Sequence, residues 1–192
     1  PEPVGAASIA QVHKATTTDG RVVAIKVLRP GIREKFARDI TTYEWAAAHL
    51  EALGGEAQRL RPRLIIANFK RWTNRELDLR REAASASELS DAMKAVDHYE
   101  VPAIDWDRTS GKVMTLDWID GIKISKVEEL QAAGHDLPQL ASRLVNAFLR
   151  QAISEGFFHA DMHQGNLFVK ADGTIAAIDF GIMGRINRQA RF

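Results

Sequence analysis

The chain of 192 residues contains no cysteine. Disulfide bonds, thiolate catalysis and cysteine-based zinc sites are therefore excluded. No apolar run reaches about 18 residues, so the sequence predicts no helix that crosses a membrane. The opening residues, PEPVGAASIAQ, contain no basic segment followed by an apolar one, which is the pattern of a signal peptide.

The sequence also lacks an excess of charge of either sign, because 26 basic residues balance 25 acidic ones. Nucleic-acid binders draw much of their affinity from massed lysine and arginine, so we expect no nucleic-acid partner. Hydrophobic residues make up 45% of the chain, and its length predicts one domain or one domain in two lobes. An initiator methionine is missing, and we expect a partial segment of a longer polypeptide.

The first half of the chain alternates between strand and helix patterns. Residues 11–16 and 22–28 are rich in β-forming side chains and flank a turn sequence, Thr18-Asp19-Gly20, which predicts a hairpin. Helix-forming residues then dominate, and helices are predicted at residues 33–52, 63–72 and 74–95. Two more strands are predicted at residues 101–106 and 112–118.

The second half begins after a linker, Asp120-Gly121. A short helix is predicted at residues 125–133, and a long amphipathic helix follows Pro138 and ends at Gly156. A loop and two short strands come last. The whole pattern predicts an α+β fold of two lobes, residues 1–121 and residues 122–192, with the second lobe mainly helical.

The most informative segment is HADMHQGNLFVKADGTIAAIDFG, at residues 159–181. Asp161, Asn166 and Asp179 are separated there by short apolar runs that read as strands. This order is typical of a protein-kinase-like phosphoryl-transfer site that uses ATP and Mg²⁺. Asp161 is predicted to orient an acceptor hydroxyl or take its proton, whereas Asn166 and Asp179 are predicted to hold Mg²⁺ against the phosphates.

A lysine in the apolar strand VVAIKVL supports this interpretation. Burying the ammonium group of Lys26 is costly unless it is paired. In a kinase-like site such a lysine bridges nucleotide phosphates and a helix glutamate, for which Glu82 is the candidate. The alternatives are a lysine that reaches water from the sheet edge and a glutamate on a solvated helix face.

Small residues precede the first strand: Gly5, Ala6, Ala7 and Ser8. Such residues let backbone N–H groups approach a phosphate closely, and Ser8 adds a donor, although the usual glycine-rich kinase pattern is missing. A simple turn is the alternative. His159 and His163 flank Asp161, and we expect His159 to support the loop rather than to bind a metal.

Four segments together resemble the UbiB (AarF-type) family of atypical kinase-like proteins. They are VGAASIAQVHKA, VVAIKVLRPG, ELDLRREAA, and HADMHQGNLFV with IDFG. The most specific among them is SIAQVH after a run of small residues. The resemblance implies a two-lobe protein-kinase-like fold, here truncated at both ends, with a helical insertion in the N-lobe between the lysine strand and the glutamate helix.

The resemblance also implies roles for individual residues. Lys26 and Glu82 would form an ion pair, and Asp161 would be the catalytic aspartate. Glu76 and Asp78 match an acidic pair of the family that faces the nucleotide or the metal. Residues 114–119, which include Met114 and Asp117, would contact adenine between the lobes. Asn166 and Asp179 would be the metal ligands.

Members of that family bind ATP with Mg²⁺ and support ubiquinone biosynthesis through ATPase activity. The resemblance therefore implies isoprenoid quinone precursors or lipid as partners, and a cytoplasmic protein that associates with membranes in its full-length form. The sequence departs from the family at Gly5, in a loop that is otherwise alanine-rich, and at Gln164, where proline is common.

Two other functions stay open at this point. Small-molecule kinases of the aminoglycoside and choline phosphotransferase type also carry H-x-D-x-H-x-x-N, although SIAQVH and the long insertion speak against them. A non-catalytic, nucleotide-gated lipid-binding module is the second alternative, and the retained carboxylates speak against it.

Overall fold

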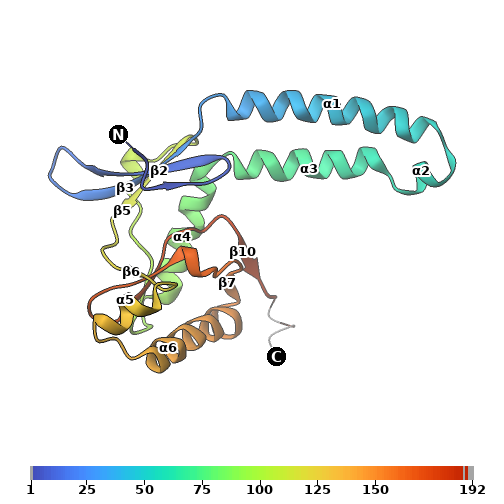
Figure 1. Cartoon of the computed structure of the whole chain (residues 1–192). Helices are drawn as coiled ribbons and strands as arrows, with labels where there is room; N and C mark the ends of the chain where they lie inside the picture. The colour runs from blue at the N-terminus through green and yellow to red at the C-terminus, as the bar shows by residue number, and fades with distance from the viewer. Residues whose placement is uncertain (1, 188, 190–192) are drawn as a thin grey trace.

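The computed structural model describes residues 2–187 and residue 189. Residues 188 and 190–192, at the end of the predicted second lobe, lie outside the described part. Figure 1 shows an antiparallel sheet and, below it, a second body of helices and short strands. A long helical hairpin projects sideways from the sheet.

The first sheet combines an early hairpin with a later strand. Its order is β1 (Gly5–Ala6), β2 (Ala10–Thr16), β3 (Val22–Leu28) and β5 (Val113–Asp117), and all neighbours are antiparallel. Gly20 has a φ of 87° in the turn between β2 and β3, a conformation that glycine adopts without steric cost. The predicted hairpin and the strand predicted at residues 112–118 are confirmed.

Three helices form the projecting hairpin: α1 (Ile32–Ala52), α2 (Gly55–Arg59) and α3 (Pro62–Glu76). α1 and α3 lie side by side, with α2 at the far end (Figure 1). The helix predicted at 33–52 is confirmed, but α3 extends past the predicted end at residue 72, because no proline or glycine interrupts it after Pro62. Among the helices that the structure describes, none combines the length and the hydropathy of a transmembrane span.

Helix α4 (Leu79–Met93) begins later than the helix predicted at residues 74–95. Asp78 has an extended backbone with a φ of −121°, and its side chain accepts the Arg80 N–H at 3.2 Å. It therefore caps a new helix instead of lying inside one. This cap places Glu82 in the first turn of α4.

The strand predicted at residues 101–106 is wrong. The structure has a two-residue strand, β4 (Tyr99–Glu100), and then a single bridge between Ile104 and Leu116. The Asp105 side chain accepts the Arg108 N–H and so begins a short 3₁₀ turn, η1 (Trp106–Arg108). A capping interaction thus replaces the ladder that the β-rich composition suggested.

The second body holds a four-stranded sheet, a two-stranded sheet and helices packed on them. The larger sheet has the order β4, β9 (Ile175–Ala177), β8 (Leu167–Val169) and β6 (Ile122–Lys123), and the smaller one pairs β7 (Phe157–His159) with β10 (Met183–Arg185). The remaining helices are α5 (Val127–Ala132), α6 (Leu137–Leu149), the π-helix η2 (Arg150–Glu155) and the 3₁₀ turn η3 (Gln164–Asn166). β4 belongs to the predicted first lobe by its position in the sequence, but it pairs with β9 in the sheet of the second body. The division of the lobes at residue 121 stays a prediction.

Helix α4 contributes to both hydrophobic cores. Leu79 and Ala83 belong to the core under the first sheet, whereas Leu89 and Met93 belong to the core of the second body. Glu82 lies next to Ala83, in the part of the helix that contacts the core under the first sheet. The packing of one helix in two cores therefore fixes where the two bodies meet.

Leu89→Ala tests the importance of this shared helix. Leu89 is 0% exposed, so its truncation is expected to lower the free energy of unfolding by about 2–5 kcal/mol. Leu53→Ala, at an 80% exposed position beyond α1, is the control and should change it by less than about 0.5 kcal/mol. Urea denaturation followed by circular dichroism measures both, and equal losses would contradict the packing described.

Candidate functional site

A cleft of about 390 Å³ lies between the first sheet and the β8–β9 region. This volume is within the range of about 300–1,000 Å³ that is usual for small-molecule pockets. Most of the predicted site residues line it: Gly5, Ala6, Ala7, Lys26, Met114, Asp117, Asn166 and Asp179. Leu116 and Trp118 add apolar surface next to Asp117.

Lys26 and Glu82 form a buried ion pair. The Lys26 Nζ donates to both carboxylate oxygens of Glu82, at 2.6 and 2.9 Å, and the side chains are 13% and 9% exposed. Burial alone would lower the pKa of Lys26, but the carboxylates of Glu82 and Asp179 outweigh it and raise that pKa. The lysine therefore stays charged.

Glu82, in the first turn of α4, is also buried, and this burial changes the pKa of its carboxyl group. It raises the pKa of Glu82, while the charge of Lys26 opposes the rise. The Phe180 N–H lies 3.5 Å from Glu82 Oε1, so α4 also contacts the segment around Asp179.

Asp179 brings the end of the chain to the same cleft. Its Oδ2 lies 3.5 Å from Lys26 Nζ, and its Oδ1 accepts the Gly181 N–H at 3.1 Å. The structure thus brings together Lys26 from β3, Glu82 from α4 and Asp179 from the segment after β9. Their roles remain predictions, but their proximity is a feature of the fold.

Asn166 and Asp179 are suited to a hard cation. Asn166 Nδ2 donates to the Asp161 carbonyl at 3.4 Å, so the Oδ1 oxygen is the atom of this side chain that a cation could contact. Among the described residues, no group of three or more histidines and carboxylates could hold a metal ion by itself. Mg²⁺ is commonly bound by one or two protein ligands together with substrate phosphates, so these two residues fit a magnesium nucleotide.

The small-residue loop forms one wall of the cleft. Arg29 Nε donates to the Ala7 carbonyl at 3.1 Å and ties the loop to the end of β3. A Cβ added to Gly5 would meet Val12 at 3.9 Å, an ordinary contact, so the fold does not require glycine there. Ser8 is exposed and is not among the lining residues, so the structure does not bring this predicted donor into the cleft.

Asp161 lies at the edge of the site rather than in its lining. It is exposed, and its N–H donates to His159 Nδ1 at 3.2 Å. His159 is 1% exposed, and its ring lies 5.8 Å from that of Phe180. Burial lowers the pKa of His159, so the ring is neutral and supports the loop as expected.

The structure separates the two residues of the predicted acidic pair. A Cβ on Gly181 would lie 3.4 Å from Asp179 and 3.9 Å from Glu76 Oε2, so Glu76 borders the site. Burial and the Asp179 charge raise the pKa of Glu76. Asp78 instead caps α4, pairs with Arg80 at 2.7 Å and lines a different cavity at the base of α1 and α3. The structure does not place Asp78 at the cleft.

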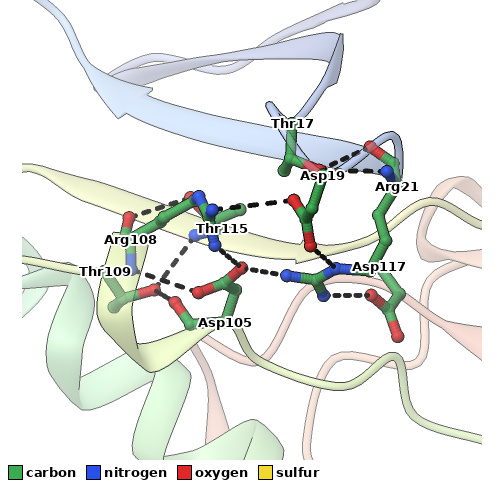
Figure 2. Close-up of polar contacts among 8 residues, drawn as sticks. All are labelled: Thr17, Asp19, Arg21, Asp105, Arg108, Thr109, Thr115 and Asp117. Atoms are coloured by element: carbon green, nitrogen blue, oxygen red, sulfur yellow. Dashed lines mark hydrogen bonds and ion pairs between the residues drawn. The ribbon is translucent and has the colours of Figure 1, made fainter.

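Sequence reasoning missed a charged network behind the strand predicted to contact adenine (Figure 2). Arg21, from the β2–β3 hairpin, contacts Asp105 at 2.7 Å and Asp117 at 3.8 Å. Arg108 also donates to Asp105 at 2.8 Å. The network links three segments and supports β5 beside the cleft, but no local pattern marks residues so distant in sequence.

Comparisons with known proteins identify relatives of this chain. A profile of the ABC1 atypical kinase-like domain matches residues 1–192. The chain is 42% identical over 190 residues to the "Probable protein kinase UbiB" of Marinobacter nauticus, covering 97% of this chain and 35% of that protein.

A solved structure is also similar, the complex of Rv3197 with erythromycin from Mycobacterium tuberculosis. Its TM-score is 0.71 at 31% identity, over 96% of this chain and 46% of that one. The chain thus spans about a third of the curated relative and about half of the solved one. These matches confirm the predicted protein-kinase-like α+β fold.

A double-mutant cycle on Lys26→Met and Glu82→Leu tests the buried pair. Each single change leaves a buried charge without its partner and is expected to lower the free energy of unfolding by about 3–5 kcal/mol. The double change removes both charges and should cost less than the sum of the two.

The exposed pair Lys94 and Asp91 provides the control for this cycle. Their side chains are 74% and 71% exposed, so the same cycle there should give a coupling below about 0.5 kcal/mol. Urea titration measures all variants. Additive losses at Lys26 and Glu82 would show that the two groups do not stabilise each other.

Proposed function

Because this chain belongs to the ABC1 atypical kinase-like domain family, we propose that it binds ATP with Mg²⁺ in the cleft beside Lys26 and promotes ATP hydrolysis or phosphoryl transfer to a small molecule. One observation carries the proposal. A buried, charged lysine and two oxygen ligands from the end of the chain, Asn166 and Asp179, line the same cleft. Phosphoryl transfer needs this combination of fixed positive charge and metal ligands.

Each residue has a role that follows from its position. Glu82 holds the Lys26 ammonium in place for contact with the α- and β-phosphates. Asn166 and Asp179 would bind Mg²⁺, which when bound neutralises charge on the phosphate oxygens. Asp161, at the open edge, orients the attacking water or hydroxyl. The apolar side chains of Met114 and Leu116 accept the adenine ring.

The wider context is part of the same proposal. The likeness to a UbiB protein supports a role in ubiquinone biosynthesis, with isoprenoid quinone precursors or lipid as partners. It also supports a cytoplasmic protein that associates with membranes. The wall of small residues in the cleft and the Lys26–Glu82 pair serve ATP binding whichever acceptor is used.

Asp161→Asn separates binding from catalysis. Because Asp161 lies outside the cleft lining, nucleotide affinity should stay within about twofold, whereas ATP turnover should fall by about 10²–10⁴-fold with loss of the base. Titration with a fluorescent ATP analogue and phosphate release measure the two properties. Asp172→Asn, at an exposed turn between β8 and β9, is the matched control and should change neither.

Two results would overturn the proposal. One is wild-type turnover in the Asp161→Asn protein, and the other is nucleotide binding that is unaffected by removal of Mg²⁺. Turnover that strictly requires an amino sugar or choline would indicate the small-molecule kinase alternative. Binding of Mg²⁺ and ATP without turnover would favour a nucleotide-gated binding module.

A further inference from the structure

Gln151 is a polar side chain that is 0% exposed, in the element that precedes β7 and Asp161. It lies in η2 (Arg150–Glu155), where the α-helix α6 gives way to a π-helix. A π-turn changes the direction of the side chains that follow it, and such turns are frequent at functional sites. The helix thus departs from regular geometry where it places this amide in the interior.

The Gln151 amide completes the hydrogen bonding of a strand edge. Its Oε1 accepts the His159 N–H at 3.0 Å. His159 is the last residue of β7, which in the described part of the chain pairs with β10 alone. A strand with a single partner leaves N–H groups open on its other side, and a buried N–H needs an acceptor. Gln151 provides this acceptor in place of a third strand.

The last residue of this strand also contacts Asp161. His159 Nδ1 accepts the Asp161 N–H at 3.2 Å, so Nδ1 carries no proton and the neutral ring holds its proton on Nε2. The Asp161 carbonyl in turn accepts from Asn166 Nδ2 at 3.4 Å. Contacts therefore run from Gln151 through His159 to Asp161 and the metal ligand Asn166.

The other end of the Gln151 amide has no such bond. Among the described residues, its Nε2 and the buried Tyr99 hydroxyl lack hydrogen-bond partners of standard geometry. Burial raises the pKa of Tyr99 to about 12, and contact with Gln151 opposes the rise. A buried amide with an unsatisfied N–H₂ group is costly. The hydrogen bond that Gln151 Oε1 accepts from the His159 N–H offsets part of this cost. An apolar side chain at position 151 could not accept that hydrogen bond.

We propose that Gln151 is a positioning residue for the proposed reaction: acting through His159, it fixes Asp161 relative to the metal ligands. It touches neither nucleotide nor metal, because it lies in η2 and is not among the residues that line the cleft. The proposal rests on the function proposed above. It predicts a defect in turnover, with the nucleotide cleft itself intact.

Two substitutions isolate the acceptor. Gln151→Met keeps the length and removes the acceptor, whereas Gln151→Glu keeps an acceptor oxygen. The methionine variant should lose about tenfold in kcat, the effect of one buried hydrogen bond, with the nucleotide Kd within about twofold of wild type. The glutamate variant should stay within about threefold of wild type in both. Tyr99→Phe, which removes the neighbouring hydroxyl, is the control and should leave kcat unchanged.

Amide hydrogen exchange gives a readout that needs no activity. In Gln151→Met the exchange rates at His159 and Asp161 should rise about tenfold, whereas those in β8 and β9 should not change. If the methionine variant fails to fold, Gln151→Asn, whose side chain is one methylene too short to reach His159, carries the same expectations.

Wild-type kcat and wild-type exchange at Asp161 in the methionine variant would overturn the proposal. So would faster exchange throughout β8 and β9, which would show that Gln151 stabilises the whole body. If the wild-type protein binds nucleotide but does not turn it over, the catalytic function fails. The exchange rates then decide by themselves whether Gln151 positions Asp161.

Discussion

The ion pair between Lys26 and Glu82 is the interaction on which the rest of the site depends. A charged lysine in a central strand is tolerated only with a partner, and its partner sits on a helix that packs in both hydrophobic cores. The position of α4 therefore determines where the Lys26 ammonium group lies. The Glu82 carboxylate also lies near the Phe180 N–H, next to Asp179. One helix thus joins Lys26 on β3 to the segment that carries Asp179.

The cleft proposed to bind the nucleotide is formed by segments that are far apart in the sequence. The small-residue loop and β5 supply walls of backbone and apolar surface, while charge comes from Lys26 on one side and Asp179 on the other. Two sets of polar contacts outside the cleft support this arrangement. Arg21 and Asp105 brace β5, and Gln151 braces the strand before Asp161. Arg21, Asp105 and Gln151 do not line the cleft themselves.

Sequence reasoning identified the parts of the site that follow from the cost of burying charge and from motif spacing. The position of Lys26 in an apolar strand predicted a charged partner. The order and spacing of Asp161, Asn166 and Asp179 predicted a kinase-like site. It failed where a side chain redirects the backbone. Asp78 was predicted at the nucleotide, but it caps α4, and Asp105 converts a predicted strand into a 3₁₀ turn. The contacts of Arg21 and Gln151 could not be predicted from the sequence, because tertiary packing determines their partners.

We expect Lys26, Asn166 and Asp179 to surround one magnesium nucleotide. Nuclear magnetic resonance with Mn²⁺ in place of Mg²⁺, together with a non-hydrolysable ATP analogue, tests this expectation directly. The paramagnetic ion should broaden the Asn166 side-chain amide and the Phe180 and Gly181 backbone amides, and leave the far end of the α1–α3 hairpin unaffected. Sharp signals at Asn166 and Gly181 in the presence of bound nucleotide would show that the metal does not lie beside these residues.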